Sequence, residues 1–148
     1  MNTTNPTRRT AREWAIQMLT AADLNPPNDI AAFEEAYFNQ ISDLDDTDGG
    51  ASEARGKLRQ FAVERFEGVM NGKDELDGVI CPLLDGWDLY RLGTVERAVL
   101  RMGVWELRHS DVPPRVAINE AIDLVNWFSS ARSRRIVNGV LDKVAKSK

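Results

Sequence analysis

Two clusters of arginine are the residues of this sequence with the clearest chemistry. The first cluster lies near the N-terminus and the second near the C-terminus: Arg8, Arg9 and Arg12, then Arg132, Arg134 and Arg135. Each lies at or just before the start of an expected helix, where guanidinium groups and free backbone N–H groups can converge on a phosphate. Charges kept in solvent for solubility would give the same composition, so both interpretations are open at this point.

The charge is unevenly distributed along the chain, although the 148 residues carry a net charge of −4. Residues 28–78 hold five basic and thirteen acidic side chains, whereas residues 113–148 hold seven basic and three acidic. A basic patch can therefore exist on an acidic protein, and the net charge does not exclude a nucleic acid as ligand.

Two segments look like phosphate or metal sites but lack the required patterns. Residues 68–73 hold two glycines and Lys73, but the P-loop needs four residues between its glycines and a Ser or Thr where Asp74 stands. The acidic run 43–48 lacks the glycine and glutamate spacing of an EF-hand and is interpreted as a solvated loop. Neither segment predicts a bound nucleotide or metal.

Side chains suited to nucleophilic or acid–base catalysis are few. His109 is the only histidine and Cys81 the only cysteine, which disfavours a zinc site or a Cys–His nucleophilic pair. Carboxylate pairs such as Glu120 and Asp123 are interpreted equally well as solvated helix faces. We therefore expect no catalytic residues, no metal, no cofactor and no enzymatic activity.

Apolar residues recur at steps of three and four along most of the chain, which is the period of a helix with one buried face. No stretch shows sustained alternation with period two. The sequence therefore predicts an all-α protein with about seven helices. The repeats cover residues 11–22, 30–44, 58–69, 76–87, 92–107, 117–128 and 136–144.

Local patterns refine two of these helices. Thr7 or Thr10 can cap the first helix, and Glu13 would complete a capping box with Thr10. The fourth pattern is the most regular in the chain. Pro82 should kink it or displace its first turn, and Cys81 should lie in the core.

The dipeptide Asn138-Gly139 is the one local pattern that disagrees with a helix. The pair is typical of a hairpin turn, yet the helical spacing continues through Val140, Leu141 and Val144. We therefore favour a helix, in which Gly139 would allow the close approach of a neighbouring backbone.

The length and composition are those of one ordinary globular domain. At 148 residues and 43% apolar residues, the chain can bury a core without disulfides or metals. No apolar run reaches membrane-spanning length, and residues 1–10 lack the apolar centre of a secretion signal. We expect a soluble cytoplasmic protein that has no membrane partner.

Several motifs resemble those of the NusB family of transcription antitermination factors. VAINEA at 116–121 and VNGVLD at 137–142 are together highly specific, and VERAVLR at 95–101 resembles the family's fifth helix. The arginine-rich start at 8–17 is also similar. The resemblance covers nearly the whole chain and is weakest over residues 28–60.

This resemblance implies an all-helical fold of two perpendicular helical subdomains, about 8–72 and 73–146, without catalytic activity. Proteins of this family bind the boxA element of ribosomal RNA leader transcripts. They do so together with the ribosomal protein NusE, in a complex that modifies RNA polymerase. The implied partners are therefore boxA RNA, NusE and the transcription elongation complex, and the implied function is regulation of transcription antitermination or termination.

The resemblance also implies roles for single residues. Residues that match the family's RNA-binding positions are Arg8, Arg9, Arg12, Gln17 and Phe128. The charge pattern adds the second cluster as RNA-binding residues: Arg132, Arg134 and Arg135. Residues on the helix that family members present to NusE are Glu96, Arg97 and Arg101.

The chain departs from the family at three aromatic positions. Thr20 stands where relatives often have tyrosine, Glu75 replaces an aromatic, and Ile136 replaces the usual phenylalanine. Stacking of a base on an aromatic side chain is worth about 1–3 kcal/mol. We therefore predict that this protein relies more on phosphate contacts than its relatives do, with an RNA affinity that falls steeply with salt.

Two other interpretations stay open. One is a protein-interaction or homodimer module with little RNA contact, which Thr20 and Glu75 favour. The other is a NusB-like domain related to ribosomal RNA methyltransferases. Because the sequence reaches Lys148 without a GxG-type cofactor-binding domain, we do not expect methyltransferase activity in this chain.

Overall fold

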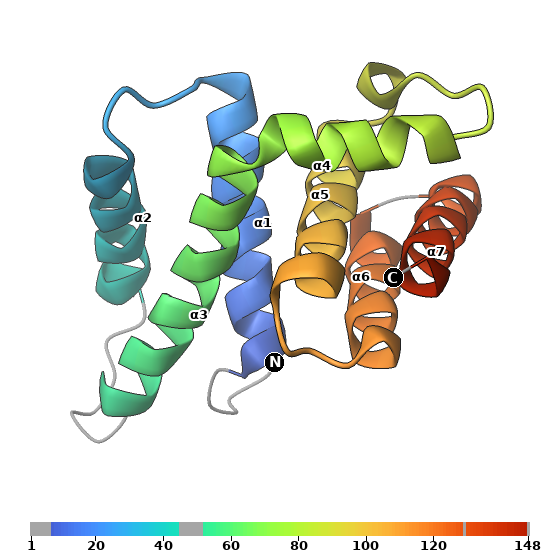
Figure 1. The fold of residues 1–148 in the computed structure, drawn as a ribbon. Helices are drawn as coiled ribbons and strands as arrows, with labels where there is room; N and C mark the ends of the chain where they lie inside the picture. Colours follow the sequence, from blue (N-terminus) through green and yellow to red (C-terminus); the bar gives the residue numbers. More distant parts are fainter. Residues whose placement is uncertain (1–6, 45–51, 129, 148) are drawn as a thin grey trace. The chain divides into compact units, whose positions relative to one another are not determined.

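The chain is helical throughout most of the described residues, 7–44, 52–128 and 130–147, of its computed structural model (Figure 1). The α-helices are α1 Arg8–Leu24, α2 Ile30–Leu44, α3 Ser52–Asn71, α4 Lys73–Ile80, α5 Thr94–His109, α6 Pro114–Phe128 and α7 Ala131–Lys146. Two short 3-10 helices, η2 Cys81–Leu83 and η3 Leu89–Arg91, lie between α4 and α5. These residues form no strand, and the all-α prediction with about seven helices is confirmed.

Two compact units make up the chain, Met1–Phe66 and Glu67–Lys148, and the boundary between them lies within α3. Aromatic side chains join the helices of the N-terminal unit. Trp14 of α1 meets Phe38 of α2 edge to face at 5.7 Å between ring centroids, and Phe33 of α2 stacks on Phe66 of α3 at 5.4 Å. Such pairs are worth about 0.5–1.5 kcal/mol beyond the area they bury.

A capping box at the start of α1 determines where the first arginines lie. Thr7 is the N-cap, and its hydroxyl accepts the backbone N–H of Thr10. The Thr10 hydroxyl in turn accepts the backbone N–H of Thr7 at 3.1 Å. A threonine cap was predicted correctly, but Thr10 rather than Glu13 completes the box. Arg8 and Arg9 therefore occupy the first turn of α1.

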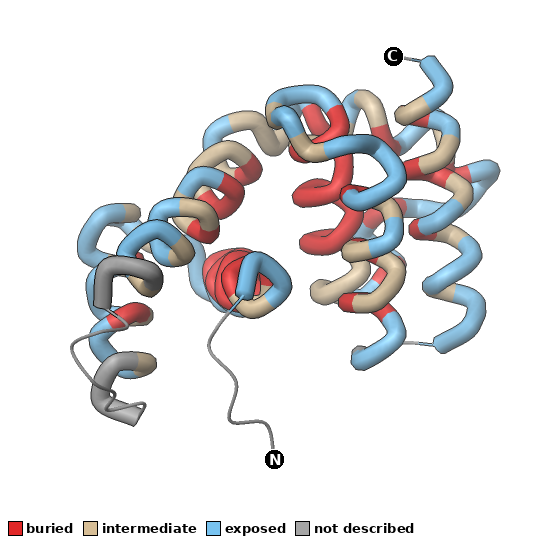
Figure 2. The backbone as a smooth tube through the Cα atoms, turned by 90° about the horizontal axis from the view of Figure 1, so that it is seen from below, coloured by how far each residue is buried: buried red, intermediate tan, exposed pale blue. Residues whose placement is uncertain are grey.

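Helix α5 is central to the C-terminal unit, because it contacts α4, α6 and α7. Figure 2 shows buried residues along most of its length. Gly103 permits the close packing, since a Cβ there would come within 2.9 Å of Leu141 Cδ1 on α7. A Cβ on Gly139 would have nothing within 4 Å, so the close approach predicted at Gly139 is wrong and occurs at Gly103 instead.

The segment after α4 differs from the sequence prediction. Helix α4 ends at Ile80, and Pro82 lies in the following 3-10 helix rather than inside a longer kinked helix. Trp87, the last member of the fourth apolar pattern, lies beyond η2 in the connector between α4 and α5, residues 81–93, and is 41% exposed. Cys81 is exposed as well, so its predicted place in the core is wrong.

Three further sequence predictions concern the helix at 136–144, the acidic run 43–48 and membrane-spanning segments. Helix α7 runs without a break through Asn138-Gly139, which confirms the helix over the hairpin. Residues 45–48 of the acidic run lie outside the described residues. No helix in the described part of the chain combines the length and apolar character needed to cross a membrane.

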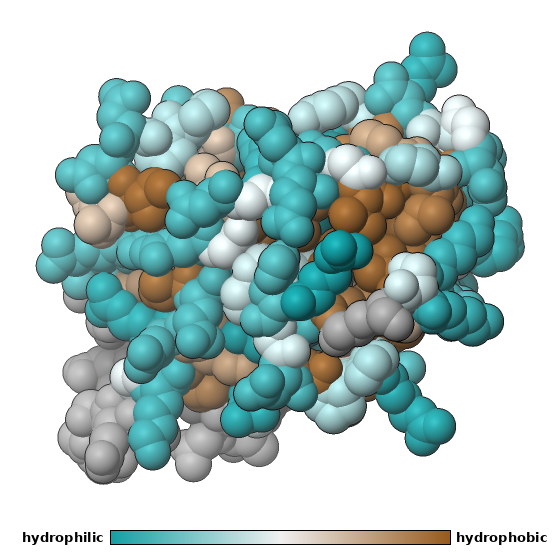
Figure 3. All heavy atoms as spheres, viewed as in Figure 1, coloured by the Kyte–Doolittle hydropathy of each residue, from teal (hydrophilic) through white to brown (hydrophobic). Residues whose placement is uncertain are grey.

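Figure 3 shows the face of the molecule seen in Figure 1. Hydrophilic side chains cover much of this face, and apolar surface shows among them over α5 to α7 of the C-terminal unit. An apolar patch rimmed by polar side chains is a candidate for contact with a partner.

Candidate nucleic-acid interface

The second arginine cluster lies in the first two turns of α7, and all three side chains are exposed: Arg132, Arg134 and Arg135. Ser130 caps the helix, because its hydroxyl accepts the backbone N–H of Ser133 at 3.3 Å. The first turn contains no acidic residue. The sequence predicted these arginines at or just before the start of a helix, and the cap places them in the first two turns of α7. Free N–H groups and guanidinium groups make this helix end suitable for phosphate.

Two contacts join the start of α7 to neighbouring parts of the same unit. The Arg132 guanidinium carbon lies 5.3 Å from the centroid of the Trp87 ring, within the range of a cation–π interaction. The Ser133 hydroxyl donates to Glu96 Oε2 at 2.9 Å. Glu96, one of the predicted partner-binding residues, is therefore half-buried and hydrogen-bonded to α7.

The first arginine cluster is divided between surface and interior. Arg8 and Arg9 are exposed, whereas Arg12 is only 3% exposed. The guanidinium carbons of Arg8 and Arg12 lie 5.5 and 5.1 Å from the centroid of the Phe61 ring on α3. Arg12 thus has a structural role within the N-terminal unit, and the exposed pair is better placed to reach a phosphate.

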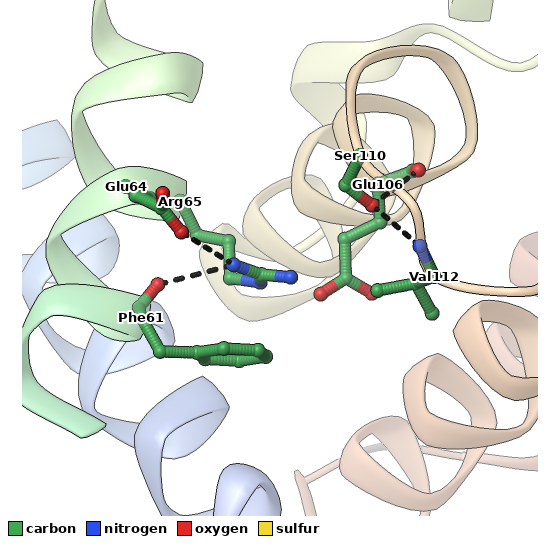
Figure 4. Close-up of polar contacts among 6 residues, drawn as sticks. All are labelled: Phe61, Glu64, Arg65, Glu106, Ser110 and Val112. Carbon is green, nitrogen blue, oxygen red and sulfur yellow. Dashed lines mark hydrogen bonds and ion pairs between the residues drawn. The ribbon is translucent and has the colours of Figure 1, made fainter. Parts of the chain in front are cut away.

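Arg65 is a third guanidinium on the same ring, and the sequence reasoning missed it. Its guanidinium carbon lies 3.4 Å from the Phe61 centroid. Its Nη1 donates to the Phe61 carbonyl at 3.2 Å and to Glu64 Oε1 at 3.4 Å (Figure 4). Arg65 lies one residue before the buried Phe66, inside the apolar repeat of α3. A charged residue at such a position was the sign in the sequence that could have predicted a buried cation. Phe61 therefore organises three cations in this unit.

Gln17 is exposed on α1 and is held by a tyrosine from α2. The Tyr37 hydroxyl donates to Gln17 Oε1, which leaves the amide NH₂ group as a donor. Burial, and then the charge of Glu13, raises the pKa of Tyr37, so the phenol stays protonated. The Thr20 hydroxyl donates a hydrogen bond to the Gln17 carbonyl oxygen at 3.0 Å. Tyr37 thus supplies an aromatic side chain beside Gln17, although residue 20 does not.

The two arginines of α5 that were predicted to bind a partner are buried, with Arg97 at 9% and Arg101 at 4% exposed. Arg101 Nε and Nη2 donate to the two oxygens of Asp77 at 2.8 and 2.9 Å, and Nη2 also donates to the Tyr90 hydroxyl at 3.2 Å. Arg97 Nη1 donates to the Leu92 carbonyl at 2.6 Å. Burial alone would lower the pKa of Arg101, but hydrogen bonding and charge from Asp77, and then Tyr90, raise it overall.

The Arg97 and Arg101 contacts hold α4 and the connector before α5 in place. Figure 4 shows the other end of α5, where the Ser110 hydroxyl donates to the Glu106 carbonyl at 2.8 Å and accepts the Val112 N–H at 3.2 Å. Helix α5 is thus fixed at both ends by side chains.

The remaining positions that the sequence singled out add little to a nucleic-acid interface. Glu75 is exposed, and its Oε2 lies 3.4 Å from His109 Nε2. Phe128 is the last residue of α6, and its side chain lies outside the described part of the structure. Among the residues that the structure describes, no three His, Cys, Asp or Glu side chains gather as a metal-binding group.

Three aromatic side chains of the C-terminal unit are exposed, and the sequence reasoning predicted none of them as a surface residue. Trp87, Tyr90 and Trp127 are 41%, 63% and 76% exposed. Trp127 is absent from the apolar repeat that predicts the buried face of α6. Its absence from that repeat was the sign that could have placed it at the surface.

Comparison with known proteins gives a consistent result over nearly the whole chain. A model of the NusB family matches residues 9–146. A transcription antitermination protein NusB from Nitratiruptor sp. is 38% identical over 140 residues, covering 95% of this chain and 92% of the relative. The protein of the same name from Yersinia enterocolitica is 43% identical over 139 residues, covering 93% and 91%.

Solved structures agree with the sequence comparison. NusB from T. maritima is similar with a TM-score of 0.76 and 27% identity, covering 97% of this chain and 93% of that chain. A crystal structure of antitermination factors NusB and NusE in complex with dsRNA is similar with a TM-score of 0.73 and 27% identity, covering 95% and 97%.

Proposed function

The chain belongs to the NusB family, and we propose that it is a transcription antitermination factor that binds boxA RNA of ribosomal RNA leader transcripts together with NusE. The observation that carries this proposal is the similarity over the whole chain to NusB proteins, one of them solved with NusE and dsRNA. The exposed arginines of α7 supply the phosphate-binding chemistry. The protein acts by binding, without catalysis.

Each unit offers its own contacts to RNA. In the N-terminal unit, Arg8 and Arg9 contact phosphates, and the Gln17 amide, oriented by Tyr37, contacts a base edge. In the C-terminal unit the contacts come from the α7 arginines and Phe128. Phosphate contacts position the RNA and base contacts specify its sequence, so Gln17 and Phe128 would contribute most to the choice of boxA.

NusE docks on the C-terminal unit beside the N-terminal part of α5. Arg97 and Arg101 contribute indirectly, because both are buried and hold the connector in place. Both guanidinium groups lie near the ring of Tyr90, at 5.2 and 5.8 Å from its centroid, and Tyr90 itself is 63% exposed. Tyr90 and Glu96 are the side chains that would touch NusE. The assembled factor then joins the transcription elongation complex in the cytoplasm.

The test is binding of fluorescently labelled single-stranded boxA RNA, measured by anisotropy with and without NusE over a range of salt. The variants are Arg134→Ala/Arg135→Ala and Arg8→Ala/Arg9→Ala. The matched control is Arg108→Ala/Arg115→Ala, which removes two exposed arginines elsewhere in the C-terminal unit. Each lost phosphate contact should lower affinity and reduce the slope of log K against log salt by about 0.7. The control variant should bind as the wild type does.

Wild-type protein that binds boxA and scrambled RNA equally, whether or not NusE is present, would contradict the proposal. So would a nearly flat salt titration, because it excludes phosphate contacts as the main source of affinity. Arginine variants that bind RNA like the wild type would favour the protein-interaction or homodimer interpretation, which sedimentation of the free protein would then test.

A further inference from the structure

Trp127 is the most exposed of the four tryptophans, at 76% of its surface. Trp14 is only 8% exposed, and Trp105 lies between buried and exposed. A tryptophan side chain presents a large apolar surface and is highly buried on average in globular proteins. An indole left in water at this level is therefore available to a ligand.

The position of Trp127 on α6 explains its exposure. It lies three residues after Leu124, which is 1% exposed and packs in the core. Trp127 lies at the edge of the buried face, outside the apolar repeat, and in the last turn of α6, which ends at Phe128. Asn126 beside it is exposed as well. Trp127 thus lies beside the buried face of α6 rather than on it, which leaves the indole in solvent.

The charge around Trp127 favours an anionic ligand over an apolar one. Helix α7 begins at Ala131, four residues after Trp127, so at most about 14 Å of extended chain separates them. The exposed arginines follow at once, and the first turn of α7 has no acidic residue. Asp123 is the only acidic residue between positions 121 and 135, against three arginines.

We propose that Trp127 is a base-stacking residue: one base of single-stranded RNA stacks on its indole while neighbouring phosphates contact Arg134 and Arg135. Aromatic side chains and basic groups together are the usual means of binding single-stranded nucleic acid. The inference rests on the proposed RNA-binding function and adds to it a residue that the family resemblance does not assign. It also compensates in part for the aromatic positions lost at Thr20 and Glu75.

The neighbouring surface of the same unit is compatible with this ligand. The Arg132 guanidinium lies on the face of Trp87 at 5.3 Å from the ring centroid. A guanidinium plane, like an aromatic ring, can stack on an RNA base. The start of α7 therefore offers RNA both charge and flat stacking surfaces.

The test measures RNA binding by the full chain with Trp127→Ala and Trp127→Phe. Leu24→Ala is the matched control, because Leu24 is an equally exposed apolar side chain (77%) and lies in the N-terminal unit. Trp127→Ala should weaken binding of labelled boxA RNA by about 5- to 150-fold. Trp127→Phe should recover most of this loss. The salt slope should not change, because no charge is removed, and circular dichroism should show intact helices.

Several results would overturn the inference. If Trp127→Ala binds RNA within about twofold of the wild type, the stacking role is wrong while the proposed function stands. Loss of NusE binding with full RNA binding would assign Trp127 to a protein surface instead. If the wild type itself binds no boxA RNA, the proposed function fails, and this inference fails with it.

Discussion

Two arginines in the N-terminal half of α5 and those at the start of α7 belong to the same unit, but their roles in the structure are opposite. Arg97 and Arg101 are buried and donate hydrogen bonds to groups on α4 and the connector. Arg134 and Arg135 are exposed on the first turns of a helix. Since Arg97 and Arg101 have partners on α4 and in the connector, whereas Arg134 and Arg135 are exposed, position rather than residue type decides whether an arginine stabilises the fold or is available to a ligand.

The N-terminal cluster shows the same division over five residues. Arg12 is buried against Phe61, while Arg8 and Arg9 remain exposed on the first turn. A single run of basic residues therefore contains both structural and surface members. Substitutions that treat such a run as one site would mix a loss of stability with a loss of binding.

The largest expected effect comes from breaking the Arg101–Asp77 pair. Arg101→Ala leaves the Asp77 carboxylate, which is 18% exposed, without its bidentate partner. Removing one member of a buried ion pair costs about 3–5 kcal/mol. We expect the free energy of unfolding to fall by about 3 kcal/mol, the lower end of that range, because Asp77 is partly exposed. Urea denaturation followed by circular dichroism measures this change.

Arg134→Ala is the matched control for that measurement, since it removes the same side chain from an exposed position. Its free energy of unfolding should stay within about 0.5 kcal/mol of the wild type. Equal losses for Arg101→Ala and Arg134→Ala would remove the contrast between the two helices.

Periodicity and motifs predicted most of the helices, because each helix buries one continuous apolar stripe. They failed where apolar residues keep the helical spacing although the α-helix has already ended. The apolar pattern from Leu76 runs on to Trp87, but α4 ends at Ile80 and the chain continues as a 3-10 helix and a turn. Asp85 and Gly86, with φ of 50° and 89°, make that turn. Spacing alone does not contain this information.

The candidate site was only partly predictable, for a related reason. Arg97 and Arg101 are four residues apart, which is the spacing of a solvated helix face as well as of a buried one. The burial of Arg101 depends on Asp77, which lies 24 residues earlier in the sequence, and Arg97 is held by the Leu92 carbonyl of the connector. Such facts arise from tertiary packing, which one sequence does not show.

Two glycines allow a second test of the difference between α5 and α7. Gly103→Ala on α5 would bring a Cβ within 2.9 Å of the buried Leu141, and such overpacking costs about 1–3 kcal/mol. The better helix propensity of alanine offsets about 0.8–1 kcal/mol, so we expect a net loss of about 1 kcal/mol. Gly139→Ala on α7 meets nothing within 4 Å and should gain about 0.5–1 kcal/mol. Thermal and urea unfolding of both variants would measure the predicted opposite signs, and changes of the same sign would contradict them.

Arg132→Ala tests the case between the buried Arg101 and the exposed Arg134, and its effect on stability should lie between theirs. Its guanidinium contacts Trp87, but both side chains are exposed, and a cation–π contact at such a site is worth about 0.5–1 kcal/mol. We expect urea unfolding to show a loss in that range for Arg132→Ala and a smaller loss for Arg132→Lys, which keeps the charge. A loss as large as that of Arg101→Ala would mean that the start of α7 is structural. Arg132 would then be a structural residue like Arg101, and the contrast with α5 would hold only for Arg134 and Arg135.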